Sequence, residues 1–162
     1  MLARIMPAVV SIRTAEVIPQ SVLNRYRGRI DPDKVLKDEK TGETLMPTGL
    51  GSGTIVHPDG YVITNQHVIA GEREITVVVY RKKPDGLEKQ QFTKVKIIAM
   101  NGFLDLAILQ IDDAAVDKLP FVPMGDSDSL TQGQDVFAIG SPLGLERSVS
   151  KGIVSIRARE SS

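Results

Sequence analysis

The sequence contains no cysteine and no tryptophan, and only two of its 162 residues are histidines. Without cysteine, this chain cannot form disulfide bonds, carry out thiol chemistry or build a cysteine-based zinc site. The two histidines, His57 and His67, do not form the tight cluster that a histidine-rich metal site requires. We therefore expect no metal site in this chain.

An excess of charge of either sign is also lacking, because 20 basic residues balance 20 acidic ones. Proteins that bind nucleic acids normally carry a basic surplus, so we expect no nucleic-acid partner. No apolar run is long enough to span a bilayer. The N-terminal stretch MLARIMPAVVSI lacks the layout of a secretory signal peptide. If the protein is exported, its signal lies outside this chain.

What the sequence does contain is a series of short apolar, β-branched runs separated by turn signals. The runs are Ala8–Ile12, Thr54–Val56, Tyr61–Thr64, Ile75–Tyr80, the alternating Phe92–Ala99, Leu104–Ile111, Asp135–Gly140 and Ser148–Ile156. A polar stretch of mixed charge, about residues 13–48, follows the first run. Short strands at this spacing, with almost no helical periodicity, predict an all-β sandwich or barrel.

Three segments carry more specific signals. The run Leu104–Ile111 is almost continuously apolar, which is typical of a strand covered on both faces. Residues 81–90 are polar and contain Pro-Asp-Gly, so we expect a loop there. Residues 112–130 are irregular and contain prolines, as expected of a connection between two halves of the protein.

His67 lies just beyond the apolar run Tyr61–Thr64, in the segment NQHVIAG, and Asp105 lies near the start of a later apolar run. A buried carboxylate there would need a partner. An aspartate that accepts a hydrogen bond from one imidazole nitrogen leaves the other nitrogen to take a proton from a hydroxyl nucleophile. The pair is therefore a candidate general base with its orienting aspartate. Alternatively, both residues are structural parts of an unrelated small β-barrel. Between the runs Thr54–Val56 and Tyr61–Thr64, Pro58-Asp59-Gly60 predicts a turn, and His57 is interpreted as an exposed residue at its edge.

Three stretches resemble, in order, the HtrA-type serine proteases of the chymotrypsin-like class. They are GSGTIVHPDGYVITNQHVIAG, NGFLDLAILQI and LPFVPMGDSDSLTQGQDVFAIGSPLGLERSVSKGIVSIRAR, and they cover residues 49–111 and 119–159. The resemblance implies that His67 is the general base and Asp105 the orienting aspartate. It also implies an all-β, chymotrypsin-like architecture. The first β-barrel would be complete over residues 1–118, with the polar insertion at about 13–48. Residues 119–162 would be a linker and the first strands of a truncated second barrel.

The sequence departs from this family at the nucleophile. Family members carry their reactive serine in a Gly-Asn-Ser-Gly-Gly type segment, which also forms the oxyanion hole. No serine of this chain has that context. Ser52 precedes His67 in a glycine-rich strand entry, and Ser141 is expected in a turn. Ser127 and Ser129 flank Asp128 in an acidic loop, and Ser161 and Ser162 are terminal. We therefore expect the chain as given to end before the nucleophilic serine and to be inactive by itself. The alternative is a non-catalytic binding or regulatory β-barrel module derived from the same family.

The resemblance further implies protein quality control, with unfolded or misfolded polypeptides as substrates and no metal or organic cofactor. It also implies an extracytoplasmic location, periplasmic or secreted, and a homo-oligomer, since the family forms trimers. The incomplete second barrel adds a separate expectation. Its strands leave apolar edges open, and such edges favour pairing with a second copy of the chain.

Overall fold

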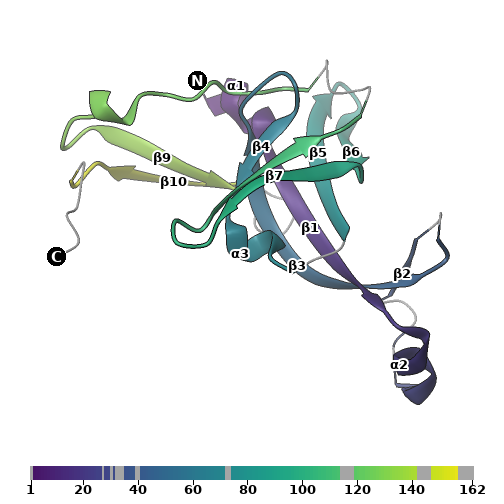
Figure 1. Cartoon of the computed structure of the whole chain (residues 1–162). Helices are drawn as coiled ribbons and strands as arrows, with labels where there is room; N and C mark the ends of the chain where they lie inside the picture. The colour runs from purple at the N-terminus through teal and green to yellow at the C-terminus, as the bar shows by residue number, and fades with distance from the viewer. Residues whose placement is uncertain are drawn as a thin grey trace.

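The structure is a computed structural model that describes residues 2–26, 28–29, 31, 35–38, 41–71, 74–113, 119–141 and 147–156. This part of the chain is mostly β, as predicted, and forms one large and one small sheet (Figure 1). The elements are α1 (Leu2–Ile5), η1 (Met6–Ala8), β1 (Val9–Ile18), α2 (Gln20–Arg25), β2 (Leu36–Lys37), β3 (Thr44–Ile55), β4 (Tyr61–Thr64), α3 (Gln66–Ile69), β5 (Glu74–Lys83), β6 (Gly86–Phe92), β7 (Val95–Asn101), β8 (Leu106–Ile111), η4 (Ser127–Ser129), β9 (Asp135–Gly140) and β10 (Ser148–Ile153). None of the described helices is long and apolar enough to cross a membrane.

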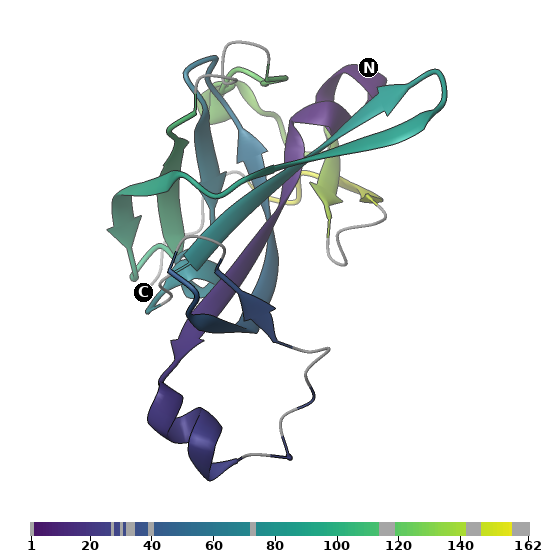
Figure 2. The same cartoon turned by 90° about the vertical axis from the view of Figure 1, so that its right-hand side faces the viewer.

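The large sheet has eight strands, all joined by antiparallel pairing. Its order is β6-β5-β1-β3-β4-β8-β7, and β2 pairs with β3 off this path. The β3–β4 connection is the Pro-Asp-Gly turn predicted from the sequence, and Gly60 adopts the positive φ of 82° that this turn needs. Figure 2 shows the long strand β1 running across the molecule between its neighbours β3 and β5.

The hydrophobic core lies on one face of this sheet. Its buried members come from six strands of the order, all except β7, and from α3 and the segment that follows β8. They are Val10, Ile12, Ile55, Val62, Ile69, Ile75, Val77, Val79, Phe92, Ala107, Leu109, Ile111 and Leu119. Leu119 belongs to the stretch that the sequence analysis assigned to the linker, yet it packs with the first sheet. Nearby, the Val122 amide donates to the Ile55 carbonyl (2.9 Å).

The first strand is longer than the predicted Ala8–Ile12, because β1 continues to Ile18. It pairs with β3 along its whole length and with β5 over Ser11–Ala15. Pairing with these distant strands extends β1 into a segment whose polar side chains do not by themselves predict a strand. Strand therefore occupies both ends of the polar stretch at about residues 13–48. Between β1 and β3, the described residues include α2 and β2.

Two other expectations are corrected. The Pro-Asp-Gly signal in residues 81–90 does mark a tight turn at Pro84 and Asp85, but the rest of this segment is not a loop: it is the end of β5 and most of β6. Since β6 is the last strand of the sheet order, its polar side chains can reach solvent. Its sequence therefore lacks the apolar pattern from which a strand is predicted. The strand β8 is covered on one face only: Leu109 is fully buried, whereas Leu106 is 45% exposed. No layer among the described residues covers its outer face.

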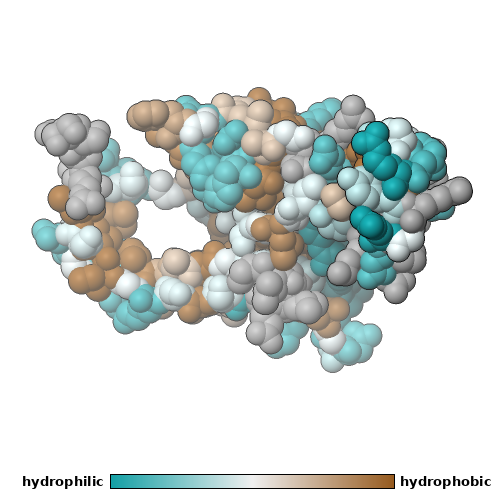
Figure 3. Space-filling view, turned by 90° about the horizontal axis from the view of Figure 1, so that it is seen from below, coloured by the Kyte–Doolittle hydropathy of each residue, from teal (hydrophilic) through white to brown (hydrophobic). Residues whose placement is uncertain are grey.

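The second sheet is a hairpin of β9 and β10, close to the predicted runs. Every residue of β10 is exposed. The end of the molecule that carries the hairpin has apolar residues on its surface. The space-filling view shows an open gap between this end and the main body (Figure 3).

Contacts with the large sheet concentrate at one end of this hairpin. The Ser141 amide donates to the Ser52 hydroxyl (2.7 Å), and the Ser141 and Ser11 hydroxyls are 2.8 Å apart. Across the hairpin, the Arg147 guanidinium donates to the Tyr80 carbonyl (2.8 Å). Burial lowers the pKa of Arg147 from its ordinary value. We refer to the contacts among Ser11, Ser52 and Ser141 as the serine junction.

Candidate active site

His67 is carried by α3, a single helical turn that begins directly after β4. The sequence analysis placed this histidine at a strand-to-loop junction and did not predict the helix, because one turn has no detectable periodicity. Close packing fixes the position of α3. A Cβ atom at Gly51 would lie only 2.6 Å from Val68 Cγ1, so a glycine in β3 lets the helix rest directly on the strand. On the same helix, Ile69 is buried in the core.

Asp105 closes the turn between β7 and β8. Its φ of 52° is the one positive value at a non-glycine residue within the described part of the chain. Aspartate tolerates this left-handed conformation better than most residues do. Two hydrogen bonds hold the turn in place. The Asn65 side-chain amide donates to the Asp105 carbonyl (3.0 Å), and the Leu104 amide donates to Asn101 Oδ1 (3.0 Å).

The carboxylate of Asp105 contacts His67 at two points. Its Oδ1 accepts from the His67 backbone amide (2.9 Å), and its Oδ2 lies 2.6 Å from His67 Nδ1. The hydrogen bond from the His67 backbone, followed by that from its ring, lowers the pKa of Asp105 below its ordinary value. The ionised carboxylate only accepts hydrogen bonds, so Nδ1 carries the proton and Nε2 is left as the acceptor in the neutral ring.

Both side chains are accessible to solvent. The exposed fraction is 70% for His67 and 42% for Asp105, which agrees with the partly buried aspartate expected at the start of an apolar strand. Asp105 lies in the turn ahead of β8, so part of its carboxylate is open to solvent. Within the described residues, Nε2 of His67 has no hydrogen-bond partner and faces no serine hydroxyl at bonding distance.

Comparisons with known proteins place this chain in one family. The profile of the trypsin-like peptidase domain matches residues 51–162. A probable periplasmic serine endoprotease, DegP-like, from Pseudomonas savastanoi is 36% identical over 94% of this chain and 33% of its own length. Its counterpart from Halomonas elongata is 37% identical over 92% of this chain and 32% of its own length. The solved structure of the HtrA-type protease AlgW with a tripeptide superposes with a TM-score of 0.62. It is 28% identical, and the match covers 96% of this chain and 38% of that one.

The chain belongs to the trypsin-like peptidases of the HtrA type. It spans about a third of the length of the curated relatives that it matches. The resemblance found in the sequence is therefore confirmed, including the partial coverage of the protease.

None of the serines that the structure describes is hydrogen-bonded to the histidine or the aspartate of this HtrA-type chain. Ser52, expected in a glycine-rich strand entry, does lie in β3, but its hydroxyl belongs to the serine junction. Ser141, expected in a turn, is buried in the same junction. Ser127 and Ser129 lie in the exposed turn η4, and Ser161 and Ser162 fall outside the described residues. The sequence analysis missed the junction, because isolated serines carry no signal for a contact across a fold.

The second histidine of the chain lies where the turn interpretation puts it. His57 Nδ1 accepts from the Asp59 amide (3.1 Å) within the β3–β4 turn, and its ring lies edge-on to Tyr61. In the described part of the chain, no three histidine, aspartate or glutamate side chains form a group able to hold a metal ion.

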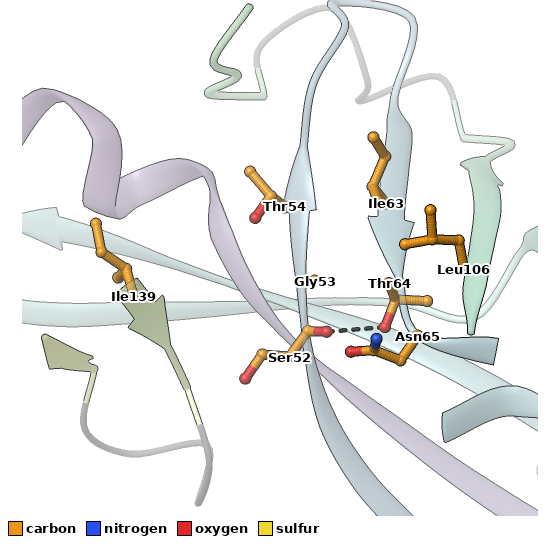
Figure 4. Close-up of a pocket in the computed structure, with 8 residues that line it drawn as sticks. All are labelled: Ser52, Gly53, Thr54, Ile63, Thr64, Asn65, Leu106 and Ile139. Carbon is orange, nitrogen blue, oxygen red and sulfur yellow. Dashed lines mark hydrogen bonds between the residues drawn. The ribbon is translucent and has the colours of Figure 1, made fainter. Parts of the chain in front are cut away.

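An open hollow adjoins the histidine and the aspartate. Figure 4 shows its lining, with Ile139 of β9 facing β3 across the open space. The lining residues are Ser52, Gly53, Thr54, Ile63, Thr64, Asn65, Leu106 and Ile139. The Thr64 hydroxyl donates to the Ser52 carbonyl (2.8 Å), the dashed line in the figure. Asn65 and Leu106 connect the hollow to the site, since one holds Asp105 in place and the other follows it in sequence.

Proposed function

We propose that this chain supplies the general base and the orienting carboxylate of an HtrA-type serine endopeptidase, with His67 as the base and Asp105 as its partner. The observation that carries this proposal is the two-point contact between the Asp105 carboxylate and His67. A surface ion pair does not require a second bond to the backbone of its partner. Here that bond orients the carboxylate, so that the other oxygen meets Nδ1.

The chemistry follows from this arrangement. Asp105 holds the proton on Nδ1, so Nε2 accepts the proton of a serine hydroxyl as that oxygen attacks a peptide carbonyl. The resulting imidazolium is stabilised by Asp105 and returns the proton to the amine that leaves. Water then releases the acyl group by the same steps. None of the serines in the 162 residues has the required context, and we propose that this chain alone is inactive.

The same proposal extends to architecture and setting. Residues 1–118 form the first barrel of a chymotrypsin-like pair, and residues 119–162 contribute the linker and the first strands of the second. The hollow between β3 and β9 opens into the cleft between these barrels. The substrates are unfolded or misfolded polypeptides, and the enzyme works as a homo-oligomer outside the cytoplasm. Support for the location comes from the matched relatives, which are named probable periplasmic proteases.

The test is to express the whole reading frame that encodes this chain and to measure casein hydrolysis and labelling by a fluorophosphonate probe. We expect His67→Ala to abolish both. Asp105→Asn should slow hydrolysis by roughly 10⁴-fold, because the amide no longer holds the productive tautomer. Asparagine also accepts a positive φ, so the turn is kept. Asp59→Asn, next to the other histidine, is the matched control and should leave the rate unchanged. Activity that survives His67→Ala would contradict the assignment.

A second candidate function is a binding or regulatory module of the same family. It is favoured by one observation, the lack of a hydroxyl partner at His67 Nε2 within the described residues. A product of the full reading frame that binds casein but neither cleaves it nor reacts with the probe would support this module and contradict the protease.

A further inference from the structure

Asn65 joins β4 to α3 and lies at the position that usually caps a helix. Its backbone has the extended conformation of a capping residue (φ −85°, ψ 143°), and asparagine is one of the preferred residues there. A capping side chain accepts a hydrogen bond from the amide two or three residues further on, here that of His67 or Val68. Within the described structure, the Asn65 side chain makes no such bond, so α3 is capped in another way.

Asp105 takes over the capping of α3. Its Oδ1 accepts from the His67 amide (2.9 Å), although Asp105 lies in the turn before β8, 38 residues away. The Asn65 side-chain amide instead donates to the backbone carbonyl of Asp105 (3.0 Å). A backbone amide has one hydrogen, so a cap from residue 65 would compete with Asp105 for it. The carboxylate would then lose the bond that turns its other oxygen toward Nδ1.

The backbone of Asp105 also depends on Asn65. Its φ of 52° is left-handed, a conformation that aspartate tolerates but that persists only where surrounding contacts hold it. Asn65 provides such a contact from a fixed strand. The preceding residue, Thr64, is 4% exposed, and its hydroxyl donates to the Ser52 carbonyl of β3 (2.8 Å). Figure 4 shows Asn65 next to this bond, at the end of β4. The Asn65 amide therefore ties the turn of Asp105 to the large sheet.

We propose that Asn65 is a positioning residue for the His67–Asp105 pair. It leaves the His67 backbone amide to the carboxylate of Asp105, and it holds the turn from which that carboxylate reaches the imidazole. Asn65 acts only through Asp105 and takes no part in proton transfer. This inference rests on the proposed function, because the position of the carboxylate affects catalysis only if His67 is the general base.

The test compares two substitutions at Asn65 in the ¹⁵N,¹³C-labelled chain. Asn65→Ala removes the side-chain amide, so the turn should open about fivefold more often, the effect of one lost hydrogen bond. Hydrogen exchange of the proton on His67 Nδ1 should accelerate by the same factor, because exchange reports local opening. Asn65→Ser removes the amide and also adds a good cap that competes for the His67 backbone amide. The two effects together should accelerate exchange at Nδ1 roughly thirtyfold.

The carboxyl signal of Asp105 separates positioning from support of the fold. The His67 backbone amide, followed by the His67 ring, holds the pKa of Asp105 below its ordinary value. In Asn65→Ser we expect this pKa to rise toward that value, because serine takes the backbone amide. The variant should nevertheless unfold at the same urea concentration as the parent chain or at a higher one, since serine caps α3.

The matched control is Asn24→Ser, the same substitution at an exposed asparagine in α2, and it should change none of these measurements. Unchanged exchange at Nδ1 in both Asn65 variants would overturn the positioning role. A lower urea midpoint in Asn65→Ser, together with an unchanged Asp105 pKa, would also overturn it, because a side chain that only supports the fold gives that combination.

The complete reading frame distinguishes this inference from the proposed function. There, Asn65→Ser should lower kcat for a peptide substrate more than Asn65→Ala does and leave KM unchanged, because a misplaced base slows the reaction without weakening binding. If His67→Ala abolishes hydrolysis but both Asn65 variants keep the parent kcat, only the positioning role fails. If hydrolysis survives His67→Ala, the proposed function fails, and the catalytic role of Asn65 fails with it.

Discussion

The large sheet and the β9–β10 hairpin are both rich in apolar, β-branched residues, but only the large sheet buries them. In β8, Leu109 and Ile111 are enclosed by neighbouring strands and by α3. In the hairpin, Phe137 and Val149 remain exposed, and Ile153 is exposed further still. An apolar strand becomes part of a core only when a second layer covers it, and the described hairpin has no such layer.

This difference determines how each region is held. The sheet is stabilised by its own apolar contacts, whereas a two-stranded hairpin is marginal in water without a packing partner. The hairpin therefore depends on contacts at one end, namely the serine junction and Arg147. The helical turn that carries His67 and the turn that carries Asp105 both belong to the large-sheet region.

The sharpest test of this comparison deletes an apolar side chain from each region. Leu109→Ala should lower the free energy of unfolding by about 2–5 kcal/mol, because it leaves a cavity in the core. Ile153→Ala should change it by less than about 0.5 kcal/mol, since its side chain already contacts water. Urea unfolding followed by circular dichroism measures both. Similar losses in the two variants would mean that the hairpin is covered in solution, for example by a second copy of the chain.

Much of this arrangement was readable from local sequence signals. The β3–β4 hairpin followed from its Pro-Asp-Gly turn, and Asp135–Gly140 from its apolar run. The edge strand β6 could not be read, because its polar side chains carry no burial pattern. The extension of β1 was also hidden, since it results from pairing with β3, which lies more than 25 residues away.

The site shows the same limit. The pairing of His67 with Asp105 was expected from the resemblance, and the structure brings the two together. The bond from the His67 amide to Asp105 could not be foreseen, because it requires both the helical turn α3 and the positive φ of Asp105. Neither the exposed fraction of a side chain nor a contact across 38 residues is encoded in local periodicity.

A smaller effect is expected from adding one methyl group to a glycine in each region. Gly51→Ala places a Cβ against Val68 and should destabilise the chain by about 1–3 kcal/mol through overpacking. It should also shift the amide signal of His67, because α3 has to move. Gly152→Ala on β10 meets open space and should be neutral or stabilising by up to about 1 kcal/mol.

Denaturation measures the change in stability of the two glycine variants, and amide chemical shifts show whether α3 moves. An unchanged His67 signal in Gly51→Ala would show that Val68 yields without moving the helix. The position of His67 would then have to be set by Ile69 and by Asp105 instead.

The smallest effect concerns the serine junction that joins the two regions. Ser141→Ala removes a buried hydroxyl and leaves the Ser11 hydroxyl with only the longer contact to the Ser141 carbonyl (3.5 Å). A lost hydrogen bond of this kind costs about 1 kcal/mol, which corresponds to roughly fivefold faster local opening. We therefore expect hydrogen exchange to accelerate about fivefold at β9 and β10 and to stay unchanged in β4 and β8. Ser150→Ala, on the exposed strand β10, is the control and should alter neither region. Equal acceleration in both sheets of Ser141→Ala would show that the junction supports the whole fold. The hairpin would then open only together with the large sheet, and the contrast between the two regions would not hold.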